Sequence, residues 1–293
     1  KSIQVNMSEY TQRIVQLYEL DSGTTLPPSS TLPDVPSPGP RGDATKPLVH
    51  TPKYVGLLLW LARALRSDIA YNTSRFASAA PGWNKSHDKA MRKTISFLKA
   101  THDYSMTLSI TDNNSNGYVL NSDASHSEPR STSGYVITYR GVPLSWSSRK
   151  QKIAATSSAM AECLSQSEAL PIAFRAKEIG EFLELSRAPV QLISEIDSSA
   201  LCGSIKKGHA DYEYIIHSTP ETSTFASLDA DYDYENVVKT VRKWEAKGGA
   251  AKAARLRLQQ IKDLTRAAAV KVVHRNTDCM SSDGLTKHLG DAK

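Results

Sequence analysis

Four carboxylates follow one another along the chain in the order Asp, Glu, Asp, Asp. Asp123 and Asp197 each end an apolar run, Glu162 stands among small and apolar residues, and Asp283 lies near the C-terminus. Hydrolysis of a phosphodiester needs an activated water and a stabilised leaving oxygen, and two divalent ions can supply both. Hard ions such as Mg²⁺ prefer carboxylate oxygens. The four residues therefore suggest a divalent-metal nuclease, although four carboxylates chosen from 30 acidic residues can fall into such an order by chance.

Short strands must position two of these carboxylates. Beyond residue 105, runs rich in Val, Ile, Thr and Tyr are separated by turn residues and predict an antiparallel meander of MTLSIT, GYVLNSD, STSGYVITYR and GVPLSWSS. A helix is expected from about Ser157 to Leu185, with Pro171 as a point where it could kink. It is followed by the strand VQLISEID, the helix AARLRLQQIKDLTRAAA, the strand VKVVH and a closing helix near Asp283. This order predicts an α/β fold with a mixed sheet.

Composition limits the classes of protein to consider. The net charge of +6 makes a polyanionic partner plausible, although many proteins that bind no nucleic acid share such an excess. Cys163, Cys202 and Cys279 are far apart and form no C-x-x-C pair, which predicts buried free thiols in a reducing compartment. The longest apolar stretch, Val55 to Ala62, is too short to span a bilayer, and no signal peptide is visible. We expect a soluble protein, and the first residue, Lys1, suggests a fragment of a longer chain.

Several segments carry a resemblance to a known family. The stretch WSSRKQKIAATSSAMAECLSQSEA, which contains Glu162, resembles the signature of the ribonuclease H domain of copia-type LTR retrotransposon polyproteins. Segments similar to that family flank it in the same order, namely SDASHSEPRSTSGYVITYRGVPLSW, EIDSSA and SSDGLTKHL. Upstream, the segments YVGLLLWLARALRSDIAYNTSRF and RKTISFLKATHDYSM resemble the connection between reverse transcriptase and ribonuclease H.

The resemblance implies a ribonuclease H-like mixed sheet, with an antiparallel three-strand meander, parallel strands and flanking helices, preceded by a small helical connection region. Residues 1–21 would be the tail of the reverse transcriptase. Residues 22–52 are rich in Pro and predict an extended linker without a packed core. The connection region would span 53–104 and the ribonuclease H-like domain 105–293, with an insertion at about 209–250.

The same resemblance implies an activity and its residues. Asp123, Glu162, Asp197 and Asp283 would bind two Mg²⁺ or Mn²⁺ ions and cleave the RNA strand of an RNA:DNA hybrid. The rest of a reverse transcriptase polyprotein is a further expected partner, and no membrane partner is expected. The expected location is intracellular, in a cytoplasmic virus-like particle or in the nucleus. No Tyr-x-Asp-Asp stretch occurs, so we do not expect DNA synthesis by this chain alone.

Six further residues are candidates for a role at the site. Ser122, Ser157 and Ser158 lie beside the carboxylates in sequence and could contact sugar or phosphate, or else cap turns and helix ends. The basic pair before the Glu162 helix and a histidine before Asp283 complete the set, namely Arg149, Lys150 and His274. The histidine stands roughly where many ribonucleases H keep a mobile His that helps product leave, although copia-type sequences usually lack it.

The insertion departs from the family pattern and leaves a second function open. Residues 209–235 are acidic and 239–275 are basic, so a basic helix could follow a hybrid backbone or be a solvated face. We interpret His209, Asp211, Glu213 and His217 as part of a loop rather than a metal site. The alternative to an active endoribonuclease is a catalytically inactive, truncated or domesticated remnant that binds nucleic acid or acts as a scaffold. An integrase-like enzyme is disfavoured, because its helical Glu comes last.

Overall fold

The chain folds into two compact units. The computed structural model describes residues 2–39, 45–109, 117–126, 130–155, 157–183, 190–206, 250–276 and 280–287. Unit 1 comprises Lys1–Ile110, Ser145–Lys150 and Gly284–Lys293, and unit 2 comprises Thr111–Leu144 and Gln151–Asp283. Within these described ranges, no helix has both the length and the apolarity to cross a membrane.

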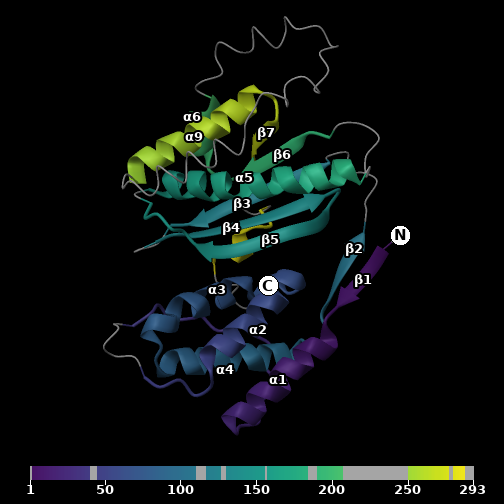
Figure 1. Ribbon diagram of the computed structural model, residues 1–293, viewed down its shortest axis with the longest axis vertical. Helices are drawn as coiled ribbons and strands as arrows, with labels where there is room; N and C mark the ends of the chain where they lie inside the picture. The colour runs from purple at the N-terminus through teal and green to yellow at the C-terminus, as the bar shows by residue number, and fades with distance from the viewer. Residues whose placement is uncertain are drawn as a thin grey trace, which may run out of the picture. The chain divides into compact units, whose positions relative to one another are not determined.

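A five-stranded mixed sheet supports the candidate site in unit 2 (Figure 1). Its strand order is β5-β4-β3-β6-β7, with the bounds β3 Tyr118–Ser125, β4 Thr132–Tyr139, β5 Val142–Lys150, β6 Leu192–Ile196 and β7 Val270–His274. Strand β3 pairs antiparallel with β4 and parallel with β6, and β6 pairs parallel with β7. The sheet therefore has the ribonuclease H-like order that was expected, with an antiparallel meander joined to parallel strands.

Local sequence explains the turn between β4 and β5. Only Arg140 and Gly141 separate the two strands, and both have positive φ, 49° and 81°. Two successive residues of positive φ form the type I′ turn that matches the twist of a hairpin, and glycine adopts this conformation without strain. The Arg-Gly pair thus fixes the hairpin at the outer part of the sheet.

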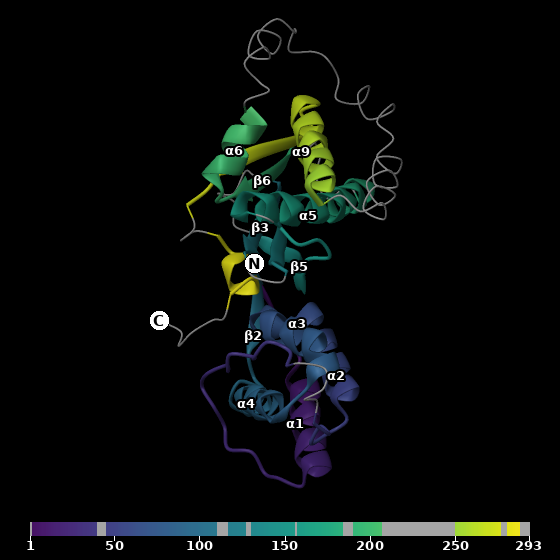
Figure 2. The same ribbon diagram turned by 90° about the vertical axis from the view of Figure 1, so that its left-hand side faces the viewer.

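Helices cover one face of the sheet and enclose its core. Helix α5 (Ser158–Phe182) runs along the sheet and continues through Pro171 (Figure 1). Helix α9 (Ala250–Arg266) packs against α5, and α6 (Ser199–Lys206) follows β6 (Figure 2). Apolar side chains from both layers meet between them, among them Leu120, Ile137, Leu170, Ile196, Leu201, Ile205 and Ile261.

The two thiols that the structure describes in this unit are buried and form no disulfide with each other, in line with the cysteine spacing. Cys163 and Cys202 both lie in the core between sheet and helices, and neither forms a disulfide. Burial raises the pKa of the Cys163 thiol to about 12, so that it stays protonated. Cys279 lies outside the described residues.

Truncation of Leu120 tests the core that supports β3. This side chain is fully buried at the centre of the sheet. We expect Leu120→Ala to lower the free energy of unfolding by about 2–5 kcal/mol, because it removes buried methyl groups and leaves a cavity. Urea denaturation measures the change, with Leu144→Ala, at a 47% exposed position of β5, as the control. A loss for Leu120→Ala no larger than for the control would contradict this assignment of the core.

Unit 1 is helical, as the sequence predicts for residues 7–20 and 53–103. Its elements are β1 Ser2–Asn6, α1 Ser8–Ser22, α2 Thr51–Ala64, η2 Ser67–Ile69, α3 Ala70–Ala79, η3 Ala80–Gly82, α4 Lys85–Ala100 and β2 Ser105–Ser109. The Asn84 side chain accepts hydrogen bonds from the backbone at the start of α4, and His87 completes a capping box. Tyr18 of α1 packs edge-on against Tyr54 of α2, with ring centroids 5.0 Å apart.

The Pro-rich segment packs more closely than its composition predicts. Its described residues between the end of α1 and the start of α2 at Thr51 form neither helix nor strand, yet Leu26, Leu32, Val35 and Val49 are buried. Side chains of α3 and α4 hold its backbone, since Asn72 donates to the Pro33 carbonyl and Lys99 to the Leu26 carbonyl. The expectation of a linker without a packed core is therefore corrected. Satisfied carbonyls and a few apolar side chains let the segment lie on the helices.

Strand β2 is not part of the meander, which corrects a second expectation. The run at 105–109 is a strand, but it pairs antiparallel with β1, where Ser2 lies opposite Ser109 and Asn6 opposite Ser105. Strand β3, the next along the chain, already has β4 and β6 as its two neighbours. A strand has only two hydrogen-bonding edges, so β2 cannot also join β3.

Candidate metal centre

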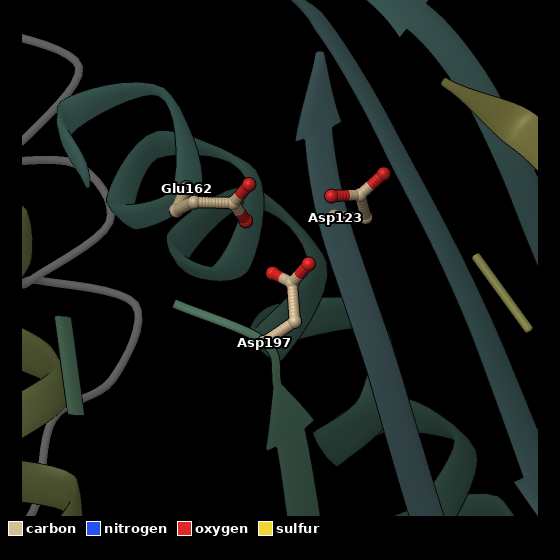
Figure 3. Close-up of side chains that lie close together, drawn as sticks. All are labelled: Asp123, Glu162 and Asp197. Atoms are coloured by element: carbon tan, nitrogen blue, oxygen red, sulfur yellow. The ribbon is translucent and has the colours of Figure 1, made fainter. Parts of the chain in front are cut away.

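Three of the four predicted carboxylates converge at one end of the sheet. Asp123 lies in β3, Glu162 in α5, and Asp197 directly after β6. Each offers a carboxylate oxygen, and these oxygens all lie within 4.8 Å of one another. Figure 3 shows the three carboxyl groups pointing toward a common space between α5 and the two strands. We call these three residues the carboxylate cluster.

The pairing of β3 with β6 explains the convergence. The two strands run parallel, with Asn121 opposite Glu195, so that the two aspartates follow two residues later at the same edge of the sheet. Glu162 reaches this edge from the first turns of α5. Ser165, one helical turn further along, donates through its hydroxyl to the Asp123 carbonyl at 2.7 Å and so fastens the helix to β3.

A second side chain holds the start of α5 against the sheet. The Gln151 side-chain amide donates to the Ser133 hydroxyl at 2.9 Å and to the Ala161 carbonyl at 2.8 Å. Sequence reasoning named neither Gln151 nor Ser165. The position of Ser165, three residues after Glu162 on a predicted helix, is the signal that could have indicated it.

Glu162 has the most perturbed electrostatics of the cluster. It is 7% exposed, and burial, followed by the negative charges of Asp123 and Asp197, raises its pKa to about 9. Its Oε1 accepts a hydrogen bond from the Ala124 amide at 3.1 Å. Its Oε2 is buried and has no hydrogen-bond donor within the part of the chain that the structure describes. A buried carboxylate that lacks a partner is unfavourable unless a proton or a cation neutralises it.

These features fit a hard divalent cation. The donor set is entirely oxygen, the negative charges are concentrated, and the Oε2 of Glu162 has no other partner among the described residues. Mg²⁺ and Mn²⁺ prefer such ligands, whereas softer ions prefer imidazole and thiolate. Asp123, Glu162 and Asp197 are therefore the residues that could hold the ion.

Asp283 lies apart from this grouping. It begins the short 3-10 helix η6 (Asp283–Leu285), where the sequence predicts a closing helix, and it is half-buried. The carboxylate cluster does not include it. A role for Asp283 as the fourth ligand therefore stays a prediction.

The three serines next to the carboxylates lie in different environments, and one of them caps helix α5. The Ser157 hydroxyl accepts a hydrogen bond from the Met160 amide and caps α5, as the capping alternative predicts. Ser158 is exposed in the first turn of α5. Ser122 is fully buried, and the alternation of a strand turns it away from the face that carries Asp123. Contact of Ser122 with nucleic acid stays a prediction, and the buried hydroxyl does not favour it.

The basic pair lies at the end of β5. Arg149 is exposed and Lys150 half-buried, and both fall in unit 1. Burial and the nearby charge of Arg75 lower the pKa of Lys150. Contact of this pair with nucleic acid stays a prediction. The insertion from 209 to 249, with its histidines and acidic residues, lies outside the described residues.

The His274 side chain contacts the backbone of Asp197, a member of the carboxylate cluster. It ends β7, and its Nε2 lies 3.0 Å from the Asp197 carbonyl, which accepts the hydrogen bond. The next amide, of Arg275, donates to the Ile196 carbonyl at 2.9 Å. These bonds hold the chain at Ile196 and Asp197, and a positioning role of His274 for Asp197 stays a prediction.

Removal of the His274 side chain tests this role. We expect His274→Ala to weaken Mn²⁺ binding about 10-fold, because groups that orient metal ligands typically have effects of this size. Isothermal titration calorimetry of the metal-binding affinity measures it. His102→Ala is the matched control, since His102 also binds a backbone carbonyl, that of Lys99, but lies in unit 1. Equal Mn²⁺ affinities of the two variants would show that His274 does not position Asp197.

Sequence comparisons relate the chain to proteins of transposable elements. No family model matches it. It is 31% identical over 119 residues, 39% of this chain and 82% of the relative, to the Secreted RxLR effector protein 161 of Plasmopara viticola. It is 29% identical over 175 residues, 55% of this chain, to the Retrovirus-related Pol polyprotein from transposon RE1 of Arabidopsis thaliana. A transposon Ty5-1 protein of Saccharomyces cerevisiae is 33% identical over 102 residues, 33% of this chain.

The chain corresponds to only part of the transposon proteins. It spans 32% of the yeast protein and 12% of the RE1 polyprotein. Among solved structures, a complex of LC11 ribonuclease H1 with an RNA/DNA hybrid is similar with a TM-score of 0.30 and 17% identity, covering 57% of this chain and 92% of that one. A foamy viral protease-reverse transcriptase has a TM-score of 0.43 and 12% identity, covering 92% of this chain and 35% of that one. By its sequence relatives, the chain is homologous to a part of the retrovirus-related Pol polyproteins of retrotransposons.

Proposed function

We propose that this chain is a metal-dependent endoribonuclease that cleaves the RNA strand of RNA:DNA hybrids. The carboxylate cluster supports the proposal most strongly, because three carboxylate oxygens, from β3, from α5 and from the residue after β6, lie within 4.8 Å of one another. The ribonuclease H-like strand order and the similarity to Pol polyproteins of retrotransposons favour the same activity. The copia-type assignment of the family stays a prediction.

Each residue of the cluster has a distinct part in this activity. Two divalent ions bound there would supply an activated water and a stabilised leaving oxygen. Asp123 and Asp197 present carboxylates from neighbouring parallel strands, so their spacing is set by the sheet. Glu162, whose pKa is raised to about 9, must release its proton before it can serve as a ligand. Ser165 and Gln151 hold α5 in place while it does so.

Cleavage of a labelled hybrid tests the proposal. The unmodified chain is incubated with an RNA:DNA hybrid, an RNA duplex and a DNA duplex of the same sequence, in Mg²⁺, in Mn²⁺ and in EDTA. We expect cleavage of the RNA strand in the hybrid alone, and only with a divalent ion, because 2′-hydroxyls on one strand distinguish the hybrid. A folded chain that leaves the hybrid intact in both ions would contradict the proposal.

A second candidate is a non-catalytic nucleic-acid-binding protein of the same fold. The carboxylate cluster has three members rather than the four that the resemblance implies, and this smaller ligand set favours the second candidate. This candidate predicts that the chain binds a hybrid with equal affinity in EDTA and in Mg²⁺ and cleaves it in neither. Filter binding at several salt concentrations, run beside the cleavage assay, separates the two candidates.

A further inference from the structure

Hydrogen bonds join four polar side chains of unit 2 that lie close in sequence to the carboxylate cluster or to Asp283. Asn121 of β3 donates through Nδ2 to Oε2 of Glu195 on β6 at 2.6 Å. Arg275 donates through Nη1 to both carboxylate oxygens of Glu195, at 2.6 Å for Oε1. The Ser281 hydroxyl donates to Oδ1 of Asn121. We call Asn121, Glu195, Arg275 and Ser281 the polar network.

The polar groups of Asn121 and Glu195 are buried, so they are satisfied only when the network has its observed geometry. Asn121 and Glu195 are each 8% exposed, so their polar groups depend on one another rather than on water. The ion pair of Glu195 with Arg275 is only part-buried, since the Arg275 side chain is 45% exposed. Loss of the Asn121 amide, in contrast, would leave a buried carboxylate oxygen of Glu195 without this donor, which is unfavourable. The network therefore favours one register of β3 against β6, and one position of the chain around Ser281.

Three members of the network precede the predicted metal ligands by two residues each. Asn121 precedes Asp123, Glu195 precedes Asp197, and Ser281 precedes Asp283. On β3, residues two apart lie on the same face, about 6.7 Å apart along the strand. Two residues of the C-terminal segment also span about 7 Å at most. A bond between Ser281 and Asn121 therefore keeps the backbone of Asp283 near the part of β3 that carries Asp123.

The C-terminal segment is itself held in a turn at this point. The Asp283 amide donates to the Met280 carbonyl at 3.3 Å. Met280, Ser282 and Leu285 are buried, so their packing fixes the position of this segment. The hydrogen bond from Ser281 to Asn121 joins the C-terminal segment to strand β3.

We propose that the polar network positions Asp283 as a fourth ligand at the carboxylate cluster, with Ser281 and Asn121 as the positioning residues. The inference rests on the proposed metal-dependent function. Arg275 supports it from the other side, because it fixes Glu195 through its side chain and the Ile196 carbonyl through its amide. The network thus joins β3, β6, the end of β7 and the C-terminal segment.

A double-mutant cycle tests the proposal through metal binding. The cycle compares Ser281→Ala, Asp283→Asn and the double variant with the unmodified chain, with Mn²⁺ affinity measured by calorimetry. We expect Ser281→Ala to weaken binding about 10-fold, Asp283→Asn to weaken it at least as much, and the double variant to equal Asp283→Asn alone. Once the carboxylate is absent, its position no longer matters, and this non-additivity is the signature of coupled residues.

Controls separate positioning from general loss of structure. Ser281→Thr keeps the hydroxyl and should restore most of the affinity that Ser281→Ala loses. Ser204→Ala removes a hydroxyl that bonds only within α6 and should leave the affinity unchanged. The unfolding midpoint of each variant without metal confirms that it is folded. Additive losses in the double variant, or no loss in Ser281→Ala, would overturn the proposal.

The cycle also distinguishes failure of this inference from failure of the proposed nuclease. If the unmodified chain binds Mn²⁺ but cleaves no hybrid, the nuclease activity is refuted, and the cycle still decides the role of the network. If the unmodified chain binds no Mn²⁺, the network positions no metal ligand, and the inference is overturned whatever the cleavage assay gives.

Discussion

We expect Asp123→Asn to lower the rate of hybrid cleavage by roughly 10³-fold or more. The substitution keeps the shape of the side chain and removes its negative charge from the carboxylate cluster. Bound metal contributes several kcal/mol of transition-state stabilisation, and each ~1.4 kcal/mol corresponds to a factor of ten in rate. A labelled RNA:DNA hybrid in saturating Mg²⁺, with single-turnover kinetics, measures the loss.

The control for Asp123→Asn is a charge removed elsewhere in the same unit. Asp263→Asn changes an exposed carboxylate on α9 that contacts Gln259 and Arg266. We expect it to keep full activity, and both variants to unfold at a similar midpoint in EDTA. An Asp123→Asn variant that still cleaves the hybrid at a rate near that of the control would refute the assignment of the metal centre.

The site could be predicted from sequence where local signals coincide with the rules of parallel sheets. Asp123 and Asp197 each follow a run of strand-forming residues, and the ends of parallel strands meet at one edge. Glu162 is an acidic residue among small and apolar neighbours on its helix, and the resemblance of its segment to a known family, more than its spacing, predicted it as a metal ligand. Its pKa could not be predicted, because it depends on burial and on two charges that only the fold brings close.

Contacts between distant segments had no comparable signal. Strand β1 pairs with β2 across about a hundred residues of sequence, and nothing in its five exposed residues indicates that partner. Val35 is fully buried within a Pro-rich stretch whose composition favours solvent. Its backbone carbonyl accepts hydrogen bonds from Arg75, a contact that depends on the tertiary placement of α3. Composition describes the average preference of a segment, whereas such contacts are decided residue by residue.

The polar network illustrates the same limit within the site. Asn121 and Glu195 belong to strands whose apolar neighbours predict the strands themselves. A polar residue on a buried strand is unfavourable by itself, and its partner is known only when the register is known. Asn121 lies opposite Glu195 in this register, and Arg275 reaches the same carboxylate from beyond β7. The pairing could therefore be read from the structure but not from the spacing.

Glu162→Gln should stabilise the metal-free protein at neutral and alkaline pH. The carboxyl has an ordinary pKa of 4.5, and burial with the neighbouring aspartates raises it to about 9 in the folded state. Below pH 4.5 both states hold the proton, so the residue does not affect the pH dependence. Between pH 4.5 and 9 the unfolded chain has released the proton and the folded chain retains it, so the free energy of unfolding falls as pH rises.

The variant lacks this dependence because glutamine carries no charge at any of these pH values. The slope attributable to one such group is about 1.4 kcal/mol per pH unit at most. We therefore expect the advantage of Glu162→Gln to grow from pH 5 to pH 9. Thermal unfolding in EDTA at several pH values measures it, with Glu181→Gln, an exposed position on the same helix, as the control.

Addition of Mn²⁺ should make the unmodified chain more stable to unfolding than Glu162→Gln. The ionised Glu162 of the unmodified chain can take part in binding the cation, and a ligand that binds only the folded state raises its stability. Glutamine offers a neutral oxygen, so the variant should gain less from the same concentration of Mn²⁺. Identical pH profiles for the unmodified chain and Glu162→Gln in EDTA would show that Glu162 is not a buried, protonated carboxyl. If only the reversal in Mn²⁺ fails, Glu162 is buried and protonated but does not bind the metal.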